Sequence, residues 1–293
     1  MFNNILIIGC GLIGSSILKS SIKQKISKNI YVFEKLNKNR TIIKKIDKKI
    51  KFIPTLNEDL GKMNFIVVCT PMSEYKFVFP KLDKFTSEKS IITEVGSTKK
   101  NLLEFTKNKK LVLSHPIAGS EVSGPKFGNK ELFNNKWCIL INKGSKKKIN
   151  LVKKFWKKLG SKVVFMNAEE HDRIFAITSH LPHLVAYNLI KTAQDFQKIQ
   201  KRNLIKYSAG GLRDFSRTAA SNEIMWRDIF FSNKKNMIKV IDLFIKNLNA
   251  FKTNIKLNKN KKLINILKNS KKVRKQIIEL KQDVSKPDFG RQI

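Results

Sequence analysis

Seven short apolar runs in the first 166 residues constrain the fold of this chain more than any other feature. Their hydrophobicity is continuous rather than alternating, and β-branched residues are frequent in them. Such runs are typical of strands that are covered on both faces, as in a parallel sheet between layers of helices. The predicted strands lie at residues 5–9, 30–34, 65–70, 90–95, 111–116, 137–142 and 162–166, and a shorter one lies at 51–53.

The sequence changes character after Met166. From Ala168 onward apolar residues recur at helical spacing, and no stretch predicts a strand. We therefore expect two domains. A Rossmann-type, doubly wound, mostly parallel α/β domain occupies residues 1–167, and an all-helical domain occupies residues 168–293.

The formal net charge of +38 raises the question of a nucleic-acid partner. A nucleic-acid-binding protein uses such charge on phosphates. Here, however, lysines occur in nearly every segment expected at the surface, without interleaved aromatic residues or zinc-ligand spacing. This pattern favours a general lysine-rich composition, and we expect no nucleic-acid partner. The positive field still speeds the approach of anionic small molecules.

The location of the protein is predicted from three further features. No apolar stretch has the length that a bilayer span needs, and no basic segment precedes the apolar run at the N-terminus. The three cysteines lie in or beside apolar stretches and share no close spacing, which is typical of a reducing compartment. We therefore expect a cytoplasmic protein that binds no membrane and has no disulfide framework.

A glycine fingerprint follows the first predicted strand. Gly9, Gly11 and Gly14 have the G-x-G-x-x-G spacing, and a helical pattern begins with Leu12 and Ile13. The first glycine allows a tight turn, the second lets a pyrophosphate approach, and the third lets helix pack on strand. The helix N-terminus then offers amide donors to the anion. We expect a dinucleotide cofactor here.

Two further loops are predicted to contact this cofactor. Glu34 ends the second strand, where a carboxylate accepts hydrogen bonds from the adenosine ribose and repels a 2′-phosphate. This position favours NAD, although three basic residues close behind it leave some room for NADP. Thr70 and Pro71 leave the end of another strand, where ligands of such sheets bind.

Ser97 and His115 are candidates for the chemistry. The segment "TEVGSTKKNLL" predicts a turn at Gly96 and a helix that begins at Ser97 or Thr98, so one hydroxyl can cap the helix while the other meets the substrate. His115 follows a strand in "LSHPIAGSEVSGP", and a neutral imidazole has the basicity to take a hydroxyl proton near pH 7. A histidine that merely bonds to the backbone at a strand end is the alternative.

The helical half adds two groups of polar residues. In "TSHLPHLVAYNL", His180 and His183 share one face of a helix that Pro182 should kink. A metal site would need a third ligand such as His171, and we expect none. In "SAGGLRDFSRTAASNEIMWRDIF" a Gly-Gly turn precedes charged and aromatic residues, and an arginine there is a natural bidentate partner for a substrate carboxylate.

Taken together, these motifs resemble one enzyme family. "GCGLIGSS", "VCTP", "EVGSTK", "HPIAGSEVSGP", "TSHLPHLVA" and "GGLRDFSRTAASNEIMWRDIF" are similar to motifs of the prephenate dehydrogenases, also called arogenate or cyclohexadienyl dehydrogenases, of tyrosine biosynthesis. They occur in family order over roughly residues 1–250. The "HP-x-AG-x-E-x-SG" and "SHLPH" motifs are far more specific than the glycine fingerprint.

The resemblance implies an oxidoreductase that uses NAD to convert prephenate to 4-hydroxyphenylpyruvate with loss of carbon dioxide. It also implies a homodimer with a substrate site between the two domains. Arogenate dehydrogenase, or dual specificity for prephenate and arogenate, is the alternative. A β-hydroxyacid-type dehydrogenase is less favoured, because those enzymes place a lysine or aspartate where this chain has "SHLPH". A basic protein that binds nucleic acid without catalysis is the non-enzyme alternative.

The resemblance also implies roles for single residues. His115 matches the catalytic histidine that bonds the ring hydroxyl, Ser97 the serine that shares this contact, and Arg217 the arginine that holds a substrate carboxylate. Five more residues match the substrate-binding region of the family: Glu121, His180, His183, Asp214 and Trp226.

Overall fold

A computed structural model describes residues 1–105 and 109–283 of the chain. It divides into two compact units, Met1–Met237 and Ile238–Ile293. The first unit holds the sheet and the helices up to α9, and the second holds α11 and most of α10. Each unit is described by itself.

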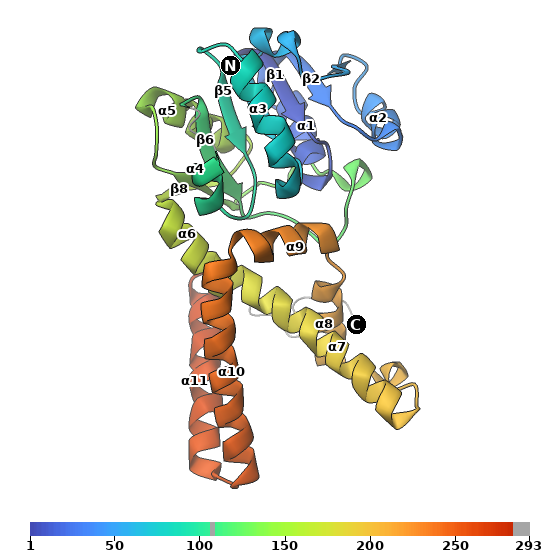
Figure 1. The fold of residues 1–293 in the computed structure, drawn as a ribbon, viewed down its shortest axis with the longest axis vertical. Coiled ribbons are helices and arrows are strands. Elements are labelled where there is room, and N and C mark those ends of the chain that lie inside the picture. The colour runs from blue at the N-terminus through green and yellow to red at the C-terminus, as the bar shows by residue number, and fades with distance from the viewer. Residues whose placement is uncertain (106–108, 284–293) are drawn as a thin grey trace. The chain divides into compact units, whose positions relative to one another are not determined.

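The first unit is built on one sheet of eight strands (Figure 1). Its strand order is β3-β2-β1-β4-β5-β6-β7-β8, and all neighbours from β3 to β6 pair in parallel. β7 runs antiparallel to β6, and β8 is parallel to β7. The mostly parallel, doubly wound sheet is therefore confirmed. The strands are β1 (Phe2–Ile8), β2 (Ser27–Phe33), β3 (Lys51–Phe52), β4 (Phe65–Val68), β5 (Ile91–Glu94), β6 (Leu111–Pro116), β7 (Trp137–Ile141) and β8 (Lys162–Met166).

Helices cover both faces of this sheet, as the continuous apolar runs predict. Ile5 and Ile7 of β1 belong to one core cluster, which packs against α1 and α5. Leu6 and Ile8 belong to the opposite cluster, which packs against α3 and α4. Successive apolar residues of β1 are all buried but enter opposite clusters in turn, which is what two covered faces require.

The helices alternate with strands up to β8 and then follow one another without a strand, within the described residues. The sheet-bearing half holds α1 (Leu12–Lys23), α2 (Asn37–Lys44), α3 (Tyr75–Phe85), α4 (Lys100–Phe105) and α5 (Lys146–Lys158). The helical half begins with α6 (Ala168–Phe175), α7 (Leu181–Gln200), α8 (Gly210–Ala219) and α9 (Glu223–Ser232). α10 (Lys234–Lys256) and α11 (Asn260–Glu279) complete it. Asn167 caps α6 by accepting from the Glu170 amide over 2.8 Å, and a domain boundary at that point stays a prediction.

Pro182 changes the helix type rather than ending the helix. A π-helical turn, Ala176–His180, lies between α6 and α7, and Pro182 sits in the first turn of α7. Proline has no amide hydrogen to donate to the preceding turn, and a widened turn is one way a helix accommodates that gap. His180 lies in this π turn, a location common for functional side chains.

The start of α4 corrects one prediction. The helix begins at Lys100 and not at Ser97 or Thr98. Its N-terminal amides are held from outside: the amide of Lys99 donates to Oδ1 of Asp172 over 2.8 Å, and that of Lys100 to Oδ2 over 2.9 Å. A carboxylate from α6 thus does the work that the sequence assigned to a local hydroxyl.

A fully buried ion pair links β5 to β6 beside this helix. Lys99 Nζ pairs with Glu94, and it donates to the Ser114 carbonyl oxygen over 2.7 Å. Glu94 also accepts from the Tyr75 hydroxyl and from the amides of Gly96 and Ser114. Because both buried charges are hydrogen-bonded to groups of the two strands and the loop between them, the pair holds the ends of both strands in place.

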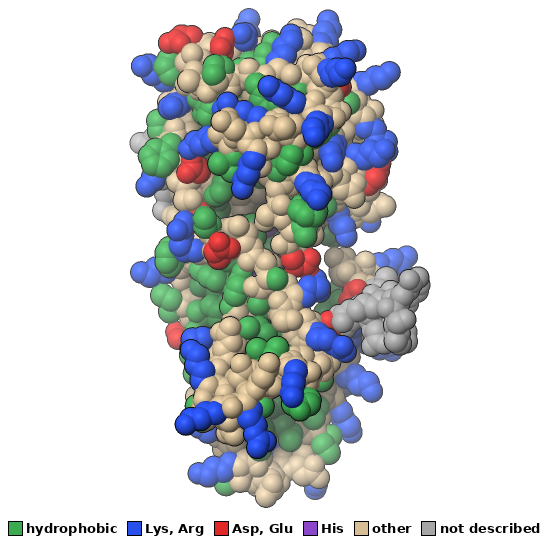
Figure 2. Space-filling model, turned by 90° about the vertical axis from the view of Figure 1, so that its right-hand side faces the viewer, with side chains coloured by type: hydrophobic (Ala, Val, Ile, Leu, Met, Phe, Trp, Pro, Cys, Tyr) green, Lys and Arg blue, Asp and Glu red, His purple; other side chains and the backbone are tan. Residues whose placement is uncertain are grey.

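One face of the molecule carries many basic side chains. On the face shown in Figure 2, lysine and arginine side chains spread over the visible surface and do not gather into one band. Among residues 1–105 and 109–283, no helix is long and apolar enough to cross a membrane.

Removing the buried lysine should destabilise the protein strongly. Lys99→Met removes the cationic partner of the buried Glu94 carboxyl group, so we expect the free energy of unfolding in urea to fall by about 3–5 kcal/mol. Lys62→Met is the matched control, because Lys62 pairs with Asp59 in solvent, and its unfolding midpoint should barely move. Equal midpoints for the two variants would show that the buried pair does not stabilise the fold.

Candidate active site

The carboxyl ends of five neighbouring parallel strands bring most predicted site residues to one edge of the sheet. In spatial order these strands are β2, β1, β4, β5 and β6. Glu34 follows β2, the glycines follow β1, Thr70 follows β4, Ser97 follows β5, and His115 lies near the end of β6. Neighbouring strands lie about 4.8 Å apart, so the row spans about 19 Å, a length that suits an extended dinucleotide.

The three glycines meet three different steric demands. Gly9 has a φ of 83°, which favours glycine, and its amide donates to the Phe33 carbonyl oxygen over 2.8 Å. A Cβ at Gly14 would collide with the carbonyl oxygen of Gly9, so glycine lets α1 pack on the turn. A Cβ at Gly11 would meet no protein atom within 4 Å. This open face beside Gly11 fits the pyrophosphate of a dinucleotide.

The first turn of α1 borders the same space. α1 begins at Leu12 with Gly11 as its N-cap and without a side-chain cap, so the amides of its first turn, including that of Ile13, have no acceptor within the helix. Amides in this position bind anions. Gly9, Gly11, Gly14 and the first turn of α1 form what we call the cradle. It combines a steric opening with donors for a phosphate.

Glu34 and Thr70 lie on either side of the cradle. The buried Glu34 carboxylate accepts from the amide of Cys10 over 2.9 Å and from that of Leu36 over 3.0 Å. These bonds fix it in place, and its remaining lone pairs can accept ribose hydroxyls. Thr70 Oγ1 is shielded from water and has no hydrogen-bond partner among the described residues, while Pro71 next to it is exposed. An orphaned buried hydroxyl fits a position that faces a ligand.

His115 is the first of three linked buried side chains. Its Nδ1 lies 2.8 Å from Nε2 of His171, and Nδ1 of His171 lies 2.8 Å from Oδ1 of Asp172. The Phe175 ring packs against both imidazoles. The hydrogen bond of the His115 ring thus goes to another side chain. Ser97, half-buried, leaves the neighbouring strand at the same edge.

All four histidines of the chain have lowered pKa values. Burial, and then the charges of His171, Lys99 and His180, holds the pKa of His115 well below its usual range. Burial also lowers the pKa of His171, although the hydrogen bond to Asp172 acts to raise it. Burial lowers the pKa of His180 to about 4, and it lowers the pKa of His183 as well. The rings are therefore neutral near pH 7, where a neutral imidazole can accept a proton.

His180 and His183 lie against the same indole, that of Trp226. Their ring centroids are 6.1 Å and 3.8 Å from it. Asn233 donates from Nδ2 to Nδ1 of His180 over 3.1 Å, so the proton of the neutral ring sits on Nε2. His180 Nε2 and Trp226 Nε1 are both buried without a partner among the described residues. Such orphaned donors cost about 1–3 kcal/mol each, and a ligand acceptor would satisfy them.

Arg217 of α8 forms an ion pair with Glu121. The two side chains are 61% and 32% exposed, so the pair is accessible and contributes little to stability. Asp214 lies three residues before Arg217 on the same helix and is half-buried. The guanidinium that the sequence singled out is therefore held beside the loop that follows His115.

Hydrogen bonds join the sheet edge to α6 and α9 within the first unit. Besides the contact of Asp172 with α4, the amide of Ser73 donates to Oδ2 of Asp228 over 2.9 Å. The hydroxyls of Thr98 and Ser232 lie 2.8 Å apart. The loops after β4 and β5 are thus attached to the helices that carry the other site residues.

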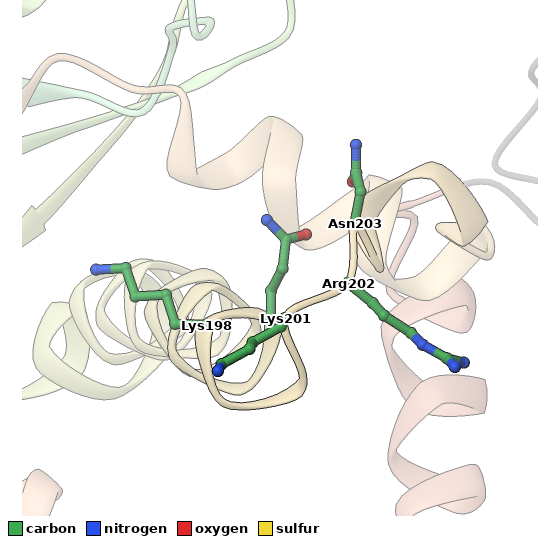
Figure 3. A pocket seen from close by; sticks show the side chains of 5 residues that line it. Lys198, Lys201, Arg202 and Asn203 are labelled. Carbon is green, nitrogen blue, oxygen red and sulfur yellow. The ribbon is translucent and has the colours of Figure 1, made fainter.

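A hollow of about 260 Å³ lies at the C-terminal end of α7 (Figure 3). It is lined by Gln197, Lys198, Lys201, Arg202 and Asn203. The cationic side chains point away from one another rather than toward a common centre. They line a turn in solvent, and they form no convergent anion site.

In the part of the chain that the structure describes, no group of three His, Cys, Asp or Glu side chains is arranged to hold a metal ion. His171, the third ligand that a metal site would have needed, hydrogen-bonds to His115 and Asp172 instead.

Two family models match most of the chain. The model of the prephenate dehydrogenase nucleotide-binding domain matches residues 21–165, and that of the prephenate dehydrogenase dimerization domain matches residues 167–269. The chain belongs to the prephenate dehydrogenase family. The glycines of the cradle precede residue 21, where the match to the nucleotide-binding model begins. Their assignment as a phosphate site therefore depends on the geometry described above.

Individual members of the family match over nearly the whole chain. A cyclohexadienyl dehydrogenase of Zymomonas mobilis is 30% identical, with 94% of this chain and 96% of the relative covered. A prephenate dehydrogenase of Bacillus subtilis is 29% identical, covering 94% and 76%. The crystal structure of Aquifex aeolicus prephenate dehydrogenase with hydroxyphenyl propionate and NAD+ is 34% identical, covers 94% of this chain and 98% of that one, and has a TM-score of 0.86.

The structure adds three residues to the candidate active site that the sequence did not predict there. His171 and Asp172 contact the His115 ring and the start of α4, and Asn233 donates to His180 and to the Asp172 carbonyl oxygen. The only sequence signal was the scarcity of histidine, four in 293 residues. Contacts over 56 and 61 positions leave no local pattern.

The two glycines of the cradle should respond differently to the same substitution. Gly11→Ala adds a methyl group to open space, so the thermal unfolding midpoint should stay unchanged while the Kd for NAD rises at least about tenfold. Gly14→Ala forces α1 away from the turn, so it should lower the unfolding midpoint as well. Thermal unfolding and titration calorimetry check both, and unchanged NAD affinity in Gly11→Ala would remove the pyrophosphate from this position.

Proposed function

We propose that this protein is an NAD-dependent prephenate dehydrogenase, which converts prephenate to 4-hydroxyphenylpyruvate and carbon dioxide in tyrosine biosynthesis. The observation that carries this proposal is the buried neutral imidazole of His115 at the carboxyl edge of the sheet, in one row with the dinucleotide cradle. Family membership and the NAD+ in the Aquifex structure support the choice of cofactor.

His115 is the acid–base group of the proposed reaction. When bound, NAD accepts the hydride: the C4–H bond of the ring breaks with its electron pair, the C1 carboxylate leaves as carbon dioxide, and its bonding pair makes the ring aromatic. His115 takes the C4 hydroxyl proton as the hydride leaves and returns it to the phenolate oxygen that forms. Ser97, at the same sheet edge, shares the contact with this oxygen. Aromatisation drives the step, so the protein mainly positions charge.

The two carboxylates of the substrate need donors, and the helical half supplies them. Arg217 is the first, because its exposed pairing with Glu121 can be exchanged for a substrate carboxylate, and Asp214 on the same helix face helps to orient it. The orphaned N–H groups of His180 and Trp226 are the second, with His183 stacked on that indole. Dispersed positive charge favours the approach of such a dianion.

Arogenate is the second candidate substrate, since one relative at 30% identity is a cyclohexadienyl dehydrogenase. Arogenate carries an ammonium group where prephenate has a keto oxygen. Donors such as Arg217 and His180 Nε2–H favour the keto acid, because they repel an ammonium group or fail to bond with it.

We also propose that the protein is a homodimer. The family's dimerization domain is present, and several large apolar side chains of the helical half are exposed. Examples on α7, α10 and α11 are Phe196, Ile199, Leu243, Leu248, Leu267 and Val273. Burying such side chains against a second copy stabilises both. Light scattering at micromolar concentration should give twice the chain mass of 33.8 kDa, and the mass of one chain would contradict the dimer.

Steady-state rates with prephenate and arogenate, each with NAD and NADP, test the function directly. We expect the highest kcat/KM with prephenate and NAD, and an acidic limb of the pH profile below pH 6.5 because burial lowers the pKa of His115. His115→Asn should lower kcat by about two to four orders of magnitude and leave the Kd for NAD nearly unchanged.

Two results would contradict the proposal. If the purified dimer turns over neither substrate, the proposed activity is wrong. If His115→Asn turns over substrate at a near-normal rate, His115 is not the acid–base group. Higher kcat/KM with arogenate would instead select the second candidate.

A further inference from the structure

We propose that His171 and Asp172 are positioning residues, which hold a proton on Nδ1 of His115 and so leave Nε2 of His115 as the atom that accepts the substrate proton. This inference rests on the proposed function, in which His115 receives the hydroxyl proton. It assigns the reacting nitrogen and the side chains that select it.

The chain of hydrogen bonds has only one arrangement of protons when both rings are neutral. The Asp172 carboxylate can only accept, so the proton of His171 lies on Nδ1, 2.8 Å from Oδ1. The Nε2 of His171 is then a lone pair that accepts from Nδ1 of His115, also over 2.8 Å. The proton of His115 is thereby placed on Nδ1, and Nε2 carries the lone pair.

The surroundings keep both rings neutral near pH 7. Burial disfavours the imidazolium of His115 most, and the nearby charge of Lys99 disfavours it as well; a proton on His171 or His180 would disfavour it further. Lys99 also lowers the pKa of His171, and burial outweighs the opposing pull of Asp172. Protonation of His171 would reverse the hydrogen bond between the two rings. An imidazolium donates from both nitrogens, so it would force the proton of His115 onto Nε2.

Asp172, the last member of this series of hydrogen bonds, is itself fixed in place. Its two oxygens accept the amides of Lys99 and Lys100, so the carboxylate cannot turn away from His171. Asn233 donates to its main-chain oxygen over 2.7 Å. His171 and Asp172 are almost completely buried, so water does not compete for these bonds.

Free neutral histidine favours the opposite tautomer, with its proton on Nε2. Without an acceptor opposite Nδ1, the His115 ring would therefore spend most of its time with the reacting nitrogen blocked. Loss of the correct tautomer can lower kcat by as much as about four orders of magnitude in enzymes that use a carboxylate–histidine pair. The hydrogen bond to His171 thus has a catalytic consequence that simple packing of the ring would not have.

Two substitutions of similar volume separate positioning from packing. His171→Gln offers an amide oxygen near the position of Nε2, so it can still accept from Nδ1 of His115. His171→Leu fills the space without an acceptor. We expect kcat to fall roughly 30- to 1000-fold in His171→Leu and to stay within about tenfold of the parent in His171→Gln. The Kd for NAD should change little in either variant, and thermal unfolding checks that both fold.

A spectroscopic measurement tests the tautomer without relying on activity. In protein labelled with ¹⁵N-histidine at pH 8, the His115 signals, assigned by their absence in His115→Asn, should show a protonated Nδ1 and an unprotonated Nε2. In His171→Leu the same signals should shift toward a protonated Nε2. In the pH profile of kcat/KM, the acidic limb of the parent should combine the titrations of His115 and His171.

Three outcomes would overturn the inference: a protonated Nε2 on His115 in the parent protein, equal kcat in the parent and both variants, or an equal loss in both variants. The last would assign His171 to packing alone. A failure of the proposed function looks different, because the parent would then turn over neither substrate while the tautomer signals remained as expected.

Discussion

The carboxylate of Asp172 is the contact on which the rest of the site depends. It binds two amides at the start of α4, and through His171 it reaches the His115 ring. One side chain of α6 therefore fixes the loop that carries Ser97 and orients the imidazole beside it. Charge-assisted bonds of this kind are short and strong when buried, so α6 is held in a fixed position at the edge of the sheet.

Burial sets the charge state of the site in two opposite ways. The buried Lys99–Glu94 ion pair is surrounded by hydrogen-bond partners, whereas burial lowers the pKa values of the four histidines and keeps their rings neutral near pH 7. Neutral rings leave lone pairs and N–H groups free to recognise a hydroxyl and carboxylates. Positive charge that favours the approach of anionic molecules lies instead at the surface, and on the face in Figure 2 the lysine and arginine side chains are dispersed.

Most of the fold and the row of residues along the sheet edge follow from the sequence. Continuous apolar runs predicted every strand, because a strand covered on both faces needs apolar residues throughout, and the strand ends then placed the glycines, Thr70 and His115 at one edge. The end of β4 at Val68, two residues before the predicted end, reflects a loop that leaves the sheet to border the cradle.

The remaining features depend on contacts between segments far apart in the chain. The cap of α4 comes from Asp172, 72 positions beyond Lys100, so the local pattern pointed to Ser97 or Thr98 instead. The partner of His115 lies 56 positions away, and His171 was weighed only as a metal ligand. Periodicity and motif spacing report on neighbours along an element, and they say nothing about which side chain a helix packed on the sheet will deliver.

The most direct test of the account is a crystal structure with NAD and an aromatic product analogue that carries a para-hydroxyl group. The account predicts that the hydroxyl oxygen lies about 2.6–3.2 Å from Nε2 of His115, with Nδ1 still on His171. A complex in which that oxygen is bound by other groups, with Nε2 of His115 beyond hydrogen-bonding reach, would contradict it.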